Sequence, residues 1–240
     1  MARTTNDPTG ARWGIGYALG GFFVGLVLSS LVASIWFGSH PGAKDLSLGA
    51  QAVAEIGLWI GLVGAPVLAS RRHGSGRLQE DFGLRGRPPD LLIGLIAGVL
   101  AQAVLVPVMG LLMRPVVGRP DTSGPVEDLI KAAHGPALAV LVLFVAVGAP
   151  IVEELFFRGL VLRSIERRLG TVWAVVLSSV LFGLAHPQPL SAGGQALVMV
   201  TLAALGAVLA TLAVRTGRLG PGIVAHAAFN AWTVAFLVLR

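Results

Sequence analysis

The chain is divided into apolar runs, each about as long as a lipid bilayer is thick. Short polar segments rich in Gly and Pro interrupt these runs, for example at residues 40–42 and 87–90. A helix that crosses a membrane needs about 20 apolar residues. The sequence therefore predicts an all-α polytopic membrane protein with about seven transmembrane helices. The predicted spans are residues 14–37, 47–70, 91–113, 137–160, 171–190, 195–214 and 221–239.

The composition agrees with this class. Hydrophobic residues make up 55% of the chain, charged residues only 12%, and the mean hydropathy is +0.80, whereas soluble domains carry about 25% charged residues. A net charge of +6 would suit nucleic acid, but the basic residues lie in short loops between apolar runs. We therefore expect membrane lipid, and no nucleic acid, as a partner. The chain has no cysteine, which excludes disulfides, thiolate metal sites and cysteine nucleophiles.

The basic residues predict the orientation, because cytoplasmic loops carry an excess of Lys and Arg. With a cytoplasmic N-terminus, thirteen of the 18 basic residues face the cytoplasm and five face outside. The cytoplasmic set is Arg3, Arg12, Arg71, Arg72, Arg77, Arg85, Arg87, Arg158, Arg163, Arg167, Arg168, Arg215 and Arg218, and the outer set is Lys44, Arg114, Arg119, Lys131 and Arg240. The bias towards Ala, Gly, Val and Arg suggests a bacterium. We therefore predict a multi-pass protein of a bacterial cytoplasmic membrane. The first apolar run is too long for a signal peptide, so we interpret it as a retained span.

Few ionisable or strongly polar side chains fall inside the predicted spans, and burying them in a bilayer is costly, so each is a functional candidate. The acidic residues, histidines and asparagines inside the predicted spans are Glu55, Glu153, Glu154, His186, His226 and Asn230. All except Glu55 lie in the last four spans. We therefore predict one membrane domain with a functional core at residues 137–240 and an N-terminal three-span region at residues 1–136. We interpret Glu55 as a structural partner for an arginine or as a residue that lines a cavity.

Glu153 and Glu154 are expected to differ in role although they are adjacent. Glu154 and Arg158 are four residues apart, so they share a helix face and can neutralise each other. Glu153 points about 100° away from that face and has no local counter-ion, as a general base requires. The alternative is that these charges form a buried ion pair that only fixes helix packing.

Depth along the helices links distant candidates. Glu153 lies 17 residues before Gly170 and His186 lies 16 after it, so an antiparallel hairpin would place both about 25 Å from the turn. Asn230 and His226 share a face of the last span but are shallower, at about 14 and 8 Å. We expect a tilt, or a cavity open to the cytoplasm, to bring them to Glu153. Phe182, one turn before His186, either packs on the imidazole or faces apolar surroundings.

Three short motifs on separate spans resemble the CPBP family, which comprises CAAX proteases and bacteriocin-processing (Abi) proteins. The resemblance covers about residues 137–239. It implies an intramembrane endopeptidase that hydrolyses a peptide bond near the membrane surface, with the last four spans as its catalytic core. The motifs are Glu153-Glu154-x-x-x-Arg158, Phe182-x-x-x-His186 and His226-x-x-x-Asn230.

The resemblance implies a catalytic set made of these glutamates, Arg158, the two histidines and Asn230. Glu153 would activate water with help from His186, while His226 and Asn230 would bind a metal or stabilise the oxyanion. Two mechanisms stay open. In one, His186, His226 and Glu153 hold Zn²⁺; in the other no cofactor is needed, and His226 and Asn230 donate to the oxyanion. An Asn amide is an uncommon zinc ligand but a good donor, which favours the second.

The expected substrate is a membrane-associated or lipidated protein or peptide. Prenylated C-termini and leader peptides both fit the family, and the sequence does not choose between them. Two other functions are compatible with buried polar groups. One is a non-catalytic bacteriocin-immunity or scaffold protein of the membrane. The other is a proton-coupled transporter, which predicts inverted repeats that the sequence lacks.

Overall fold

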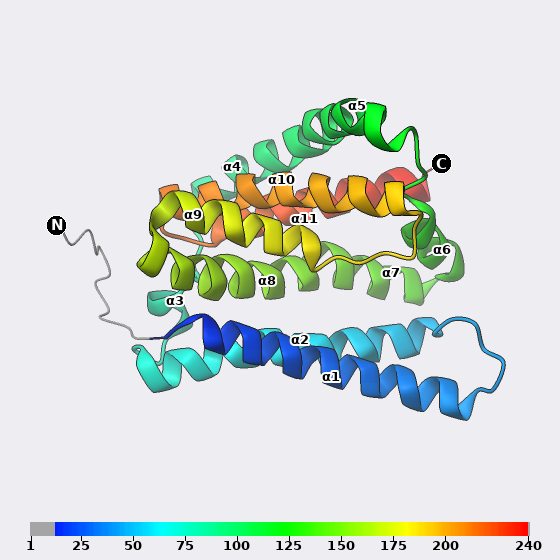
Figure 1. Cartoon of the computed structure of the whole chain (residues 1–240), viewed down its shortest axis with the longest axis horizontal. Helices are drawn as coiled ribbons and strands as arrows, with labels where there is room; N and C mark the ends of the chain where they lie inside the picture. Colours follow the sequence, from blue (N-terminus) through cyan, green and yellow to red (C-terminus); the bar gives the residue numbers. More distant parts are fainter. Residues whose placement is uncertain (1–12, 240) are drawn as a thin grey trace.

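The computed structural model describes residues 13–239, where every regular element is a helix (Figure 1). This confirms the all-α class; Arg3, Arg12 and Arg240 of the charge argument lie outside the described residues. The α-helices are α1 (Ile15–Ser39), α2 (Leu48–His73), α3 (Leu78–Asp81), α4 (Pro88–Leu100), α5 (Val106–Val117), α6 (Gly124–Ala132), α7 (Pro136–Leu143), α8 (Ala149–Glu153), α9 (Leu162–Leu184), α10 (Ala192–Thr216) and α11 (Gly220–Val238). Three π-helical segments, η1 (Ala101–Leu105), η2 (Phe144–Gly148) and η3 (Glu154–Val161), continue the helices around them.

Six helical stretches in the described chain are long and apolar enough to cross a membrane. One of them, Pro136–Leu184, is 49 residues long and bends at Gly170. Gly170 has φ 80° and ψ 171°, a conformation that glycine adopts without steric cost. The chain reverses direction there, at the left end of the bundle in Figure 1. The two arms correspond to the fourth and fifth predicted spans, so the prediction of about seven agrees with the structure.

The predicted fifth span, 171–190, ends too late. The helix stops at Leu184, because Pro187 disfavours a helical conformation at His186. Figure 1 shows that α9 stops short of the right-hand end of the bundle, and a non-helical segment connects it to α10. His186 therefore lies just beyond the free end of a short helical arm, rather than inside a helix.

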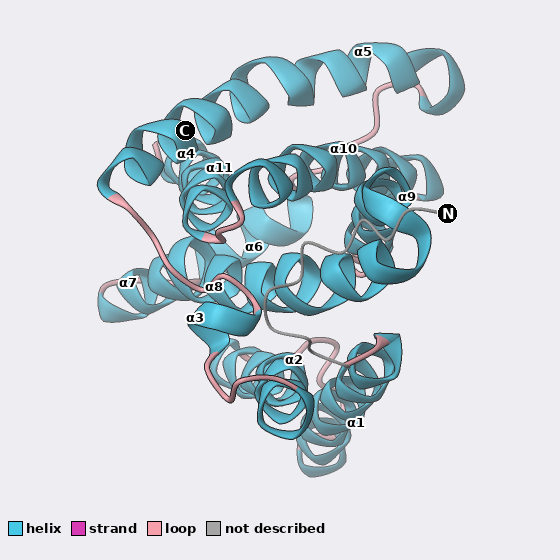
Figure 2. Cartoon of the chain, turned by 90° about the vertical axis from the view of Figure 1, so that its left-hand side faces the viewer, coloured by secondary structure: helices cyan, strands magenta, loops and turns pink. Residues whose placement is uncertain are grey.

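The helices pack closely where glycines face a neighbouring backbone. A Cβ atom at Gly61 on α2 would collide with the backbone of Gly21 and Gly25 on α1. A Cβ at Gly98 on α4 would collide with Ala225 on α11 in the same way. Small residues drive helix association in membranes by allowing such approach. Figure 2 shows α8 between the α1–α2 pair and the helices α9, α10 and α11. The π-helical segment η3 contacts α1 and α2 as well as α9 and α10, and all eight of its residues are buried.

A polar network joins the start of α4 to the turn between α10 and α11. Asp90 accepts from the main-chain N–H of Arg87 at 2.8 Å and from Nη2 of Arg218 at 2.5 Å. The hydrogen bond to Asp90 raises the pKa of Arg218 above its ordinary value, so the pair stays charged at physiological pH. The helix begins at Pro88, three residues earlier than predicted, and therefore includes Asp90. These bonds fix the point where α11 enters the bundle.

Candidate active site

Glu154 and Arg158 form the ion pair that their spacing predicts, although they lie in a π-helical segment. Their Oε1 and Nη1 atoms are 2.8 Å apart, and both side chains are fully buried. Arg158 Nη2 donates to the carbonyl of Gly206 on α10 at 3.3 Å. The guanidinium also lies over the ring of Phe182, 4.2 Å from its centroid. This pair therefore joins η3 to both α9 and α10.

Glu153, the last residue of α8, faces two imidazoles, one on α11 and one just beyond the end of α9. Its Oε2 atom lies 3.4 Å from Nε2 of His186 and 3.9 Å from Nε2 of His226. The hairpin count predicted the first approach, and the structure brings these two residues together. We expected a tilt or a cavity to bring His226 to Glu153; in the structure α11 packs against η2 and α8, which places His226 beside Glu153. A carboxylate and two imidazoles thus converge from three parts of the chain.

Hydrogen bonds and packing orient both imidazoles. His186 Nδ1 lies 2.6 Å from the carbonyl of Phe182; because a carbonyl only accepts, this nitrogen carries the proton and Nε2 is left facing Glu153. His226 turns Nδ1 to Glu154 at 3.5 Å. Phe182 is fully buried, and its ring centroid lies 4.6 Å from that of His186 and 5.6 Å from that of His226. Phe182 therefore packs against both imidazoles and does not face lipid.

The side chain of Asn230 is bound to the main chain of η2, although the motif groups Asn230 with the other site residues. Its Nδ2 atom donates to the carbonyl of Val145 in η2 at 2.8 Å. The contacts found among residues 13–239 do not join Asn230 to Glu153 or His186. An amide nitrogen has two N–H groups, and one of those of Asn230 is committed to η2.

The sequence left two roles open for Glu55, a partner for an arginine or a residue that lines a cavity. Glu55 lies on α2, close enough to Glu153 and His186 to interact with both electrostatically. On the same helix, Trp59 stacks on Phe144, with ring centroids 5.1 Å apart. The sequence pointed to Glu55 because it is the only acidic residue inside the first three predicted spans.

Gln195 is a site residue that sequence reasoning missed. It lies in the first turn of α10, and its side-chain amide donates to the carbonyl of His186 at 3.2 Å. No motif or charge pattern marks it. Only the course of the chain between α9 and α10 brings it to His186.

A zinc site would need His186, His226 and a carboxylate to converge on one point at about 2 Å from each ligand atom. In the described part of the chain, no three His, Cys, Asp or Glu side chains are placed to hold a metal ion.

The fold and the site define a polytopic membrane protein with a buried carboxylate–imidazole centre. Residues 135–232 match the family model described as "Type II CAAX prenyl endopeptidase Rce1-like". The matched segment runs from the start of α7 into α11 and contains all three motifs. This segment is an Rce1-like domain, which is consistent with the CPBP family and supports an intramembrane endopeptidase in general terms. No curated protein and no solved structure matches the chain.

Proposed function

We propose that water activated by Glu153 and His186 hydrolyses a peptide bond in a membrane-associated or lipidated protein or peptide. One observation carries the proposal: Glu153 Oε2 lies 3.4 Å from His186 Nε2 and 3.9 Å from His226 Nε2. That oxygen is buried, and no hydrogen-bond partner is seen for it among the described residues. An acceptor in this position is ready to take a proton from a bound water.

One water molecule could bridge Glu153 Oε2 and His186 Nε2, which are 3.4 Å apart. A water oxygen about 2.8 Å from both Glu153 Oε2 and His186 Nε2 would form a triangle on their 3.4 Å base. Glu153 takes a proton from this water as its oxygen bonds to the carbonyl carbon of the substrate. The proton then passes from Glu153 to the departing amine nitrogen as the C–N bond breaks. General acid–base catalysis of this kind contributes about 10²–10⁴-fold in rate.

The negative oxygen of the tetrahedral intermediate needs donors. In the tautomer that carries its proton on Nε2, His226 can donate from this atom while Nδ1 lies 3.5 Å from Oε1 of Glu154. Asn230 can donate through the N–H that Val145 does not use. Such preorganised donors stabilise the charge that develops in the transition state. This division gives each of the three motifs a chemical role.

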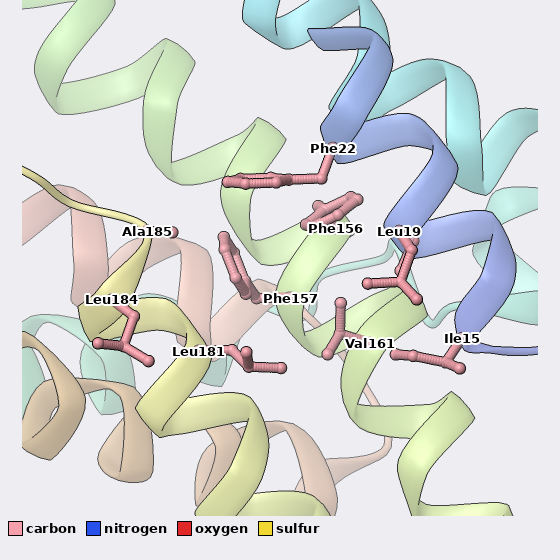
Figure 3. Close-up of a pocket in the computed structure, with 10 residues that line it drawn as sticks. Ile15, Leu19, Phe22, Phe156, Phe157, Val161, Leu181, Leu184 and Ala185 are labelled. Atoms are coloured by element: carbon pink, nitrogen blue, oxygen red, sulfur yellow. The ribbon is translucent and has the colours of Figure 1, made fainter. Parts of the chain in front are cut away.

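An apolar groove supports a substrate with a lipid chain or a membrane-embedded segment. It encloses about 170 Å³ between α1, η3 and the end of α9 (Figure 3). The residues that line it are Ile15, Ala18, Leu19, Phe22, Phe156, Phe157, Val161, Leu181, Leu184 and Ala185. Its last residue precedes His186 in the chain, and Leu19 and Leu184 are exposed at its edge. An apolar chain could thus approach the site from the bilayer without crossing water.

The proposal is tested with the purified full-length protein in lipid nanodiscs and matched prenylated and unprenylated peptides. We expect Glu153→Ala and His186→Ala to fold and to lose cleavage by about 10²–10⁴-fold. Glu127→Ala is the control, since Glu127 pairs with the exposed Lys131 on α6 and lies outside the proposed site, and it should cleave like wild type. Cleavage that survives Glu153→Ala would overturn the assignment.

The groove is tested separately in the same assay. Leu184→Asp places a charge at its edge, and this should raise KM for the prenylated peptide more than for the unprenylated one. Leu111→Asp, on an exposed apolar face of α5, controls for the general effect of a charge on a lipid-facing surface. An equal change in KM for both peptides would remove the groove from the proposal.

A further inference from the structure

The chain between α9 and α10 has few main-chain donors, because Pro187 and Pro189 carry no N–H. Two of the remaining donors are satisfied within the segment and its helix. His186 donates to the last turn of α9 at 3.3 Å, and Leu190 donates to the carbonyl of Gln188 at 2.8 Å. The N–H of Gln188 instead bonds to a side chain of the next helix.

That side chain is Gln195, and both ends of its amide are used. Its Oε1 accepts from the N–H of Gln188 at 2.5 Å, and its Nε2 donates to the carbonyl of His186 at 3.2 Å. The carbonyl of a residue at a helix end has no intrahelical donor, so this bond satisfies a group that the end of α9 leaves open. The first turn of α10 holds Gln195, whose own N–H donates to Ser191 at 2.8 Å.

His186 is thereby held at two points. Its ring is fixed by the 2.6 Å bond from Nδ1 to Phe182, and its main chain by Gln195. We propose that Gln195 is a positioning residue for hydrolysis, which holds His186 so that Nε2 faces Glu153. This inference rests on the function proposed above. It assigns to α10 the role of aligning the site, although α10 contributes no group to the chemistry.

Loss of the hydrogen bond from Gln195 to the His186 carbonyl should slow hydrolysis more than the strength of one hydrogen bond would suggest. His186 lies beyond the end of α9, so no helical hydrogen bond restrains its carbonyl. A displacement of about 1 Å in a group that positions water can cost about 10²-fold in rate. The ring would stay near Glu153 through its bond to Phe182, but its distance and angle to the water would no longer be fixed.

The test compares the full-length protein in nanodiscs with Gln195→Ala, Gln195→Glu and Gln188→Ala. Gln195→Glu keeps an acceptor for the N–H of Gln188 but loses the donor to His186. Gln188→Ala is the matched control, because only the main-chain N–H of Gln188 takes part and this group is retained. The kcat and KM values are measured on the prenylated peptide per folded enzyme.

We expect both Gln195 variants to lower kcat by about 10–100-fold with KM changed by less than about twofold. Gln188→Ala should keep both constants within about twofold of wild type. A wild-type kcat in Gln195→Ala would overturn the inference. So would a loss of folded protein with an unchanged kcat per folded enzyme, because that result marks a purely structural role.

A second readout needs no substrate. Mass spectrometry follows the rate at which diethyl pyrocarbonate modifies His186 in each variant. We expect several-fold faster modification in Gln195→Ala and an unchanged rate in Gln188→Ala. If wild type cleaves neither peptide, the proposed hydrolysis fails, yet this rate still decides the position of His186. Equal rates in Gln195→Ala and wild type would contradict the inference.

Discussion

Glu153 and Glu154 are adjacent in the chain but have opposite surroundings. Glu154 is fully buried and paired with Arg158 at 2.8 Å, while Glu153 is partly exposed and faces two imidazoles. The spacing to Arg158 predicted this division, because residues four apart share a helix face. Glu154, paired with Arg158, holds the helices around the site together. Glu153, which has no arginine partner among the described residues, is available to accept a proton.

The Glu154–Arg158 pair should therefore matter to folding more than to chemistry. Arg158→Met leaves a buried carboxylate without its partner, and we expect a loss of about 3–5 kcal/mol in stability. The double variant Glu154→Met/Arg158→Met should recover a large part of that loss. Thermal unfolding in detergent measures both. A double variant that is as unstable as the sum of the two single variants would contradict the pairing.

Metal dependence is the second prediction at the scale of residues. Because an Asn amide such as that of Asn230 is an uncommon zinc ligand but a good donor to an oxyanion, we expect cleavage to continue after chelation and dialysis. Elemental analysis of the same sample should find less than one zinc per chain. Loss of cleavage on chelation, restored by added Zn²⁺ alone, would contradict the metal-free chemistry.

At the scale of elements, the helix positions could be predicted well and their irregularities could not. Apolar runs of sufficient length predict spans directly, and the count around Gly170 placed Glu153 level with His186. The π-helical segments leave no trace in hydropathy, although η3 carries Glu154 and Arg158. The early end of α9 was predictable in principle, because Pro187 follows His186 and disfavours a helical conformation there.

The network around Asp90 gives a prediction for elements that lie far from the chemistry. Asp90→Ala removes a cap of α4 and the partner of Arg218. The cap alone is worth about 1 kcal/mol, and α11 would lose one of its attachments at the same end. We expect a lower unfolding midpoint and reduced cleavage, with KM little changed. Unchanged stability and kcat would show that this network does not position α11.

At the scale of the whole molecule, the site depends on contacts that no sequence pattern encodes. Glu55 reaches the site only because α2 packs against η3 and α8. Gln195 reaches His186 only because the chain folds back between α9 and α10. Residues that act through charge or a spaced motif could be predicted from the sequence. Residues that act through tertiary packing could not.

The orientation in the membrane is testable on the whole chain, which has no cysteine of its own. The excess of Arg at one end predicts that the turn after α2 is cytoplasmic and that the turn before α6 lies outside. In intact cells, an impermeant thiol reagent should label Thr122→Cys but not Arg72→Cys. Both residues are exposed in the structure. The reverse labelling pattern would invert the topology.

The most direct test of the account is the isosteric change Glu153→Gln, which removes the proton acceptor and keeps the shape of the side chain. Single-turnover cleavage of a prenylated peptide is measured at equal amounts of folded enzyme. We predict that the variant binds the peptide like wild type and cleaves it at least about 10²-fold more slowly. Cleavage at the wild-type rate would show that Glu153 is not the base.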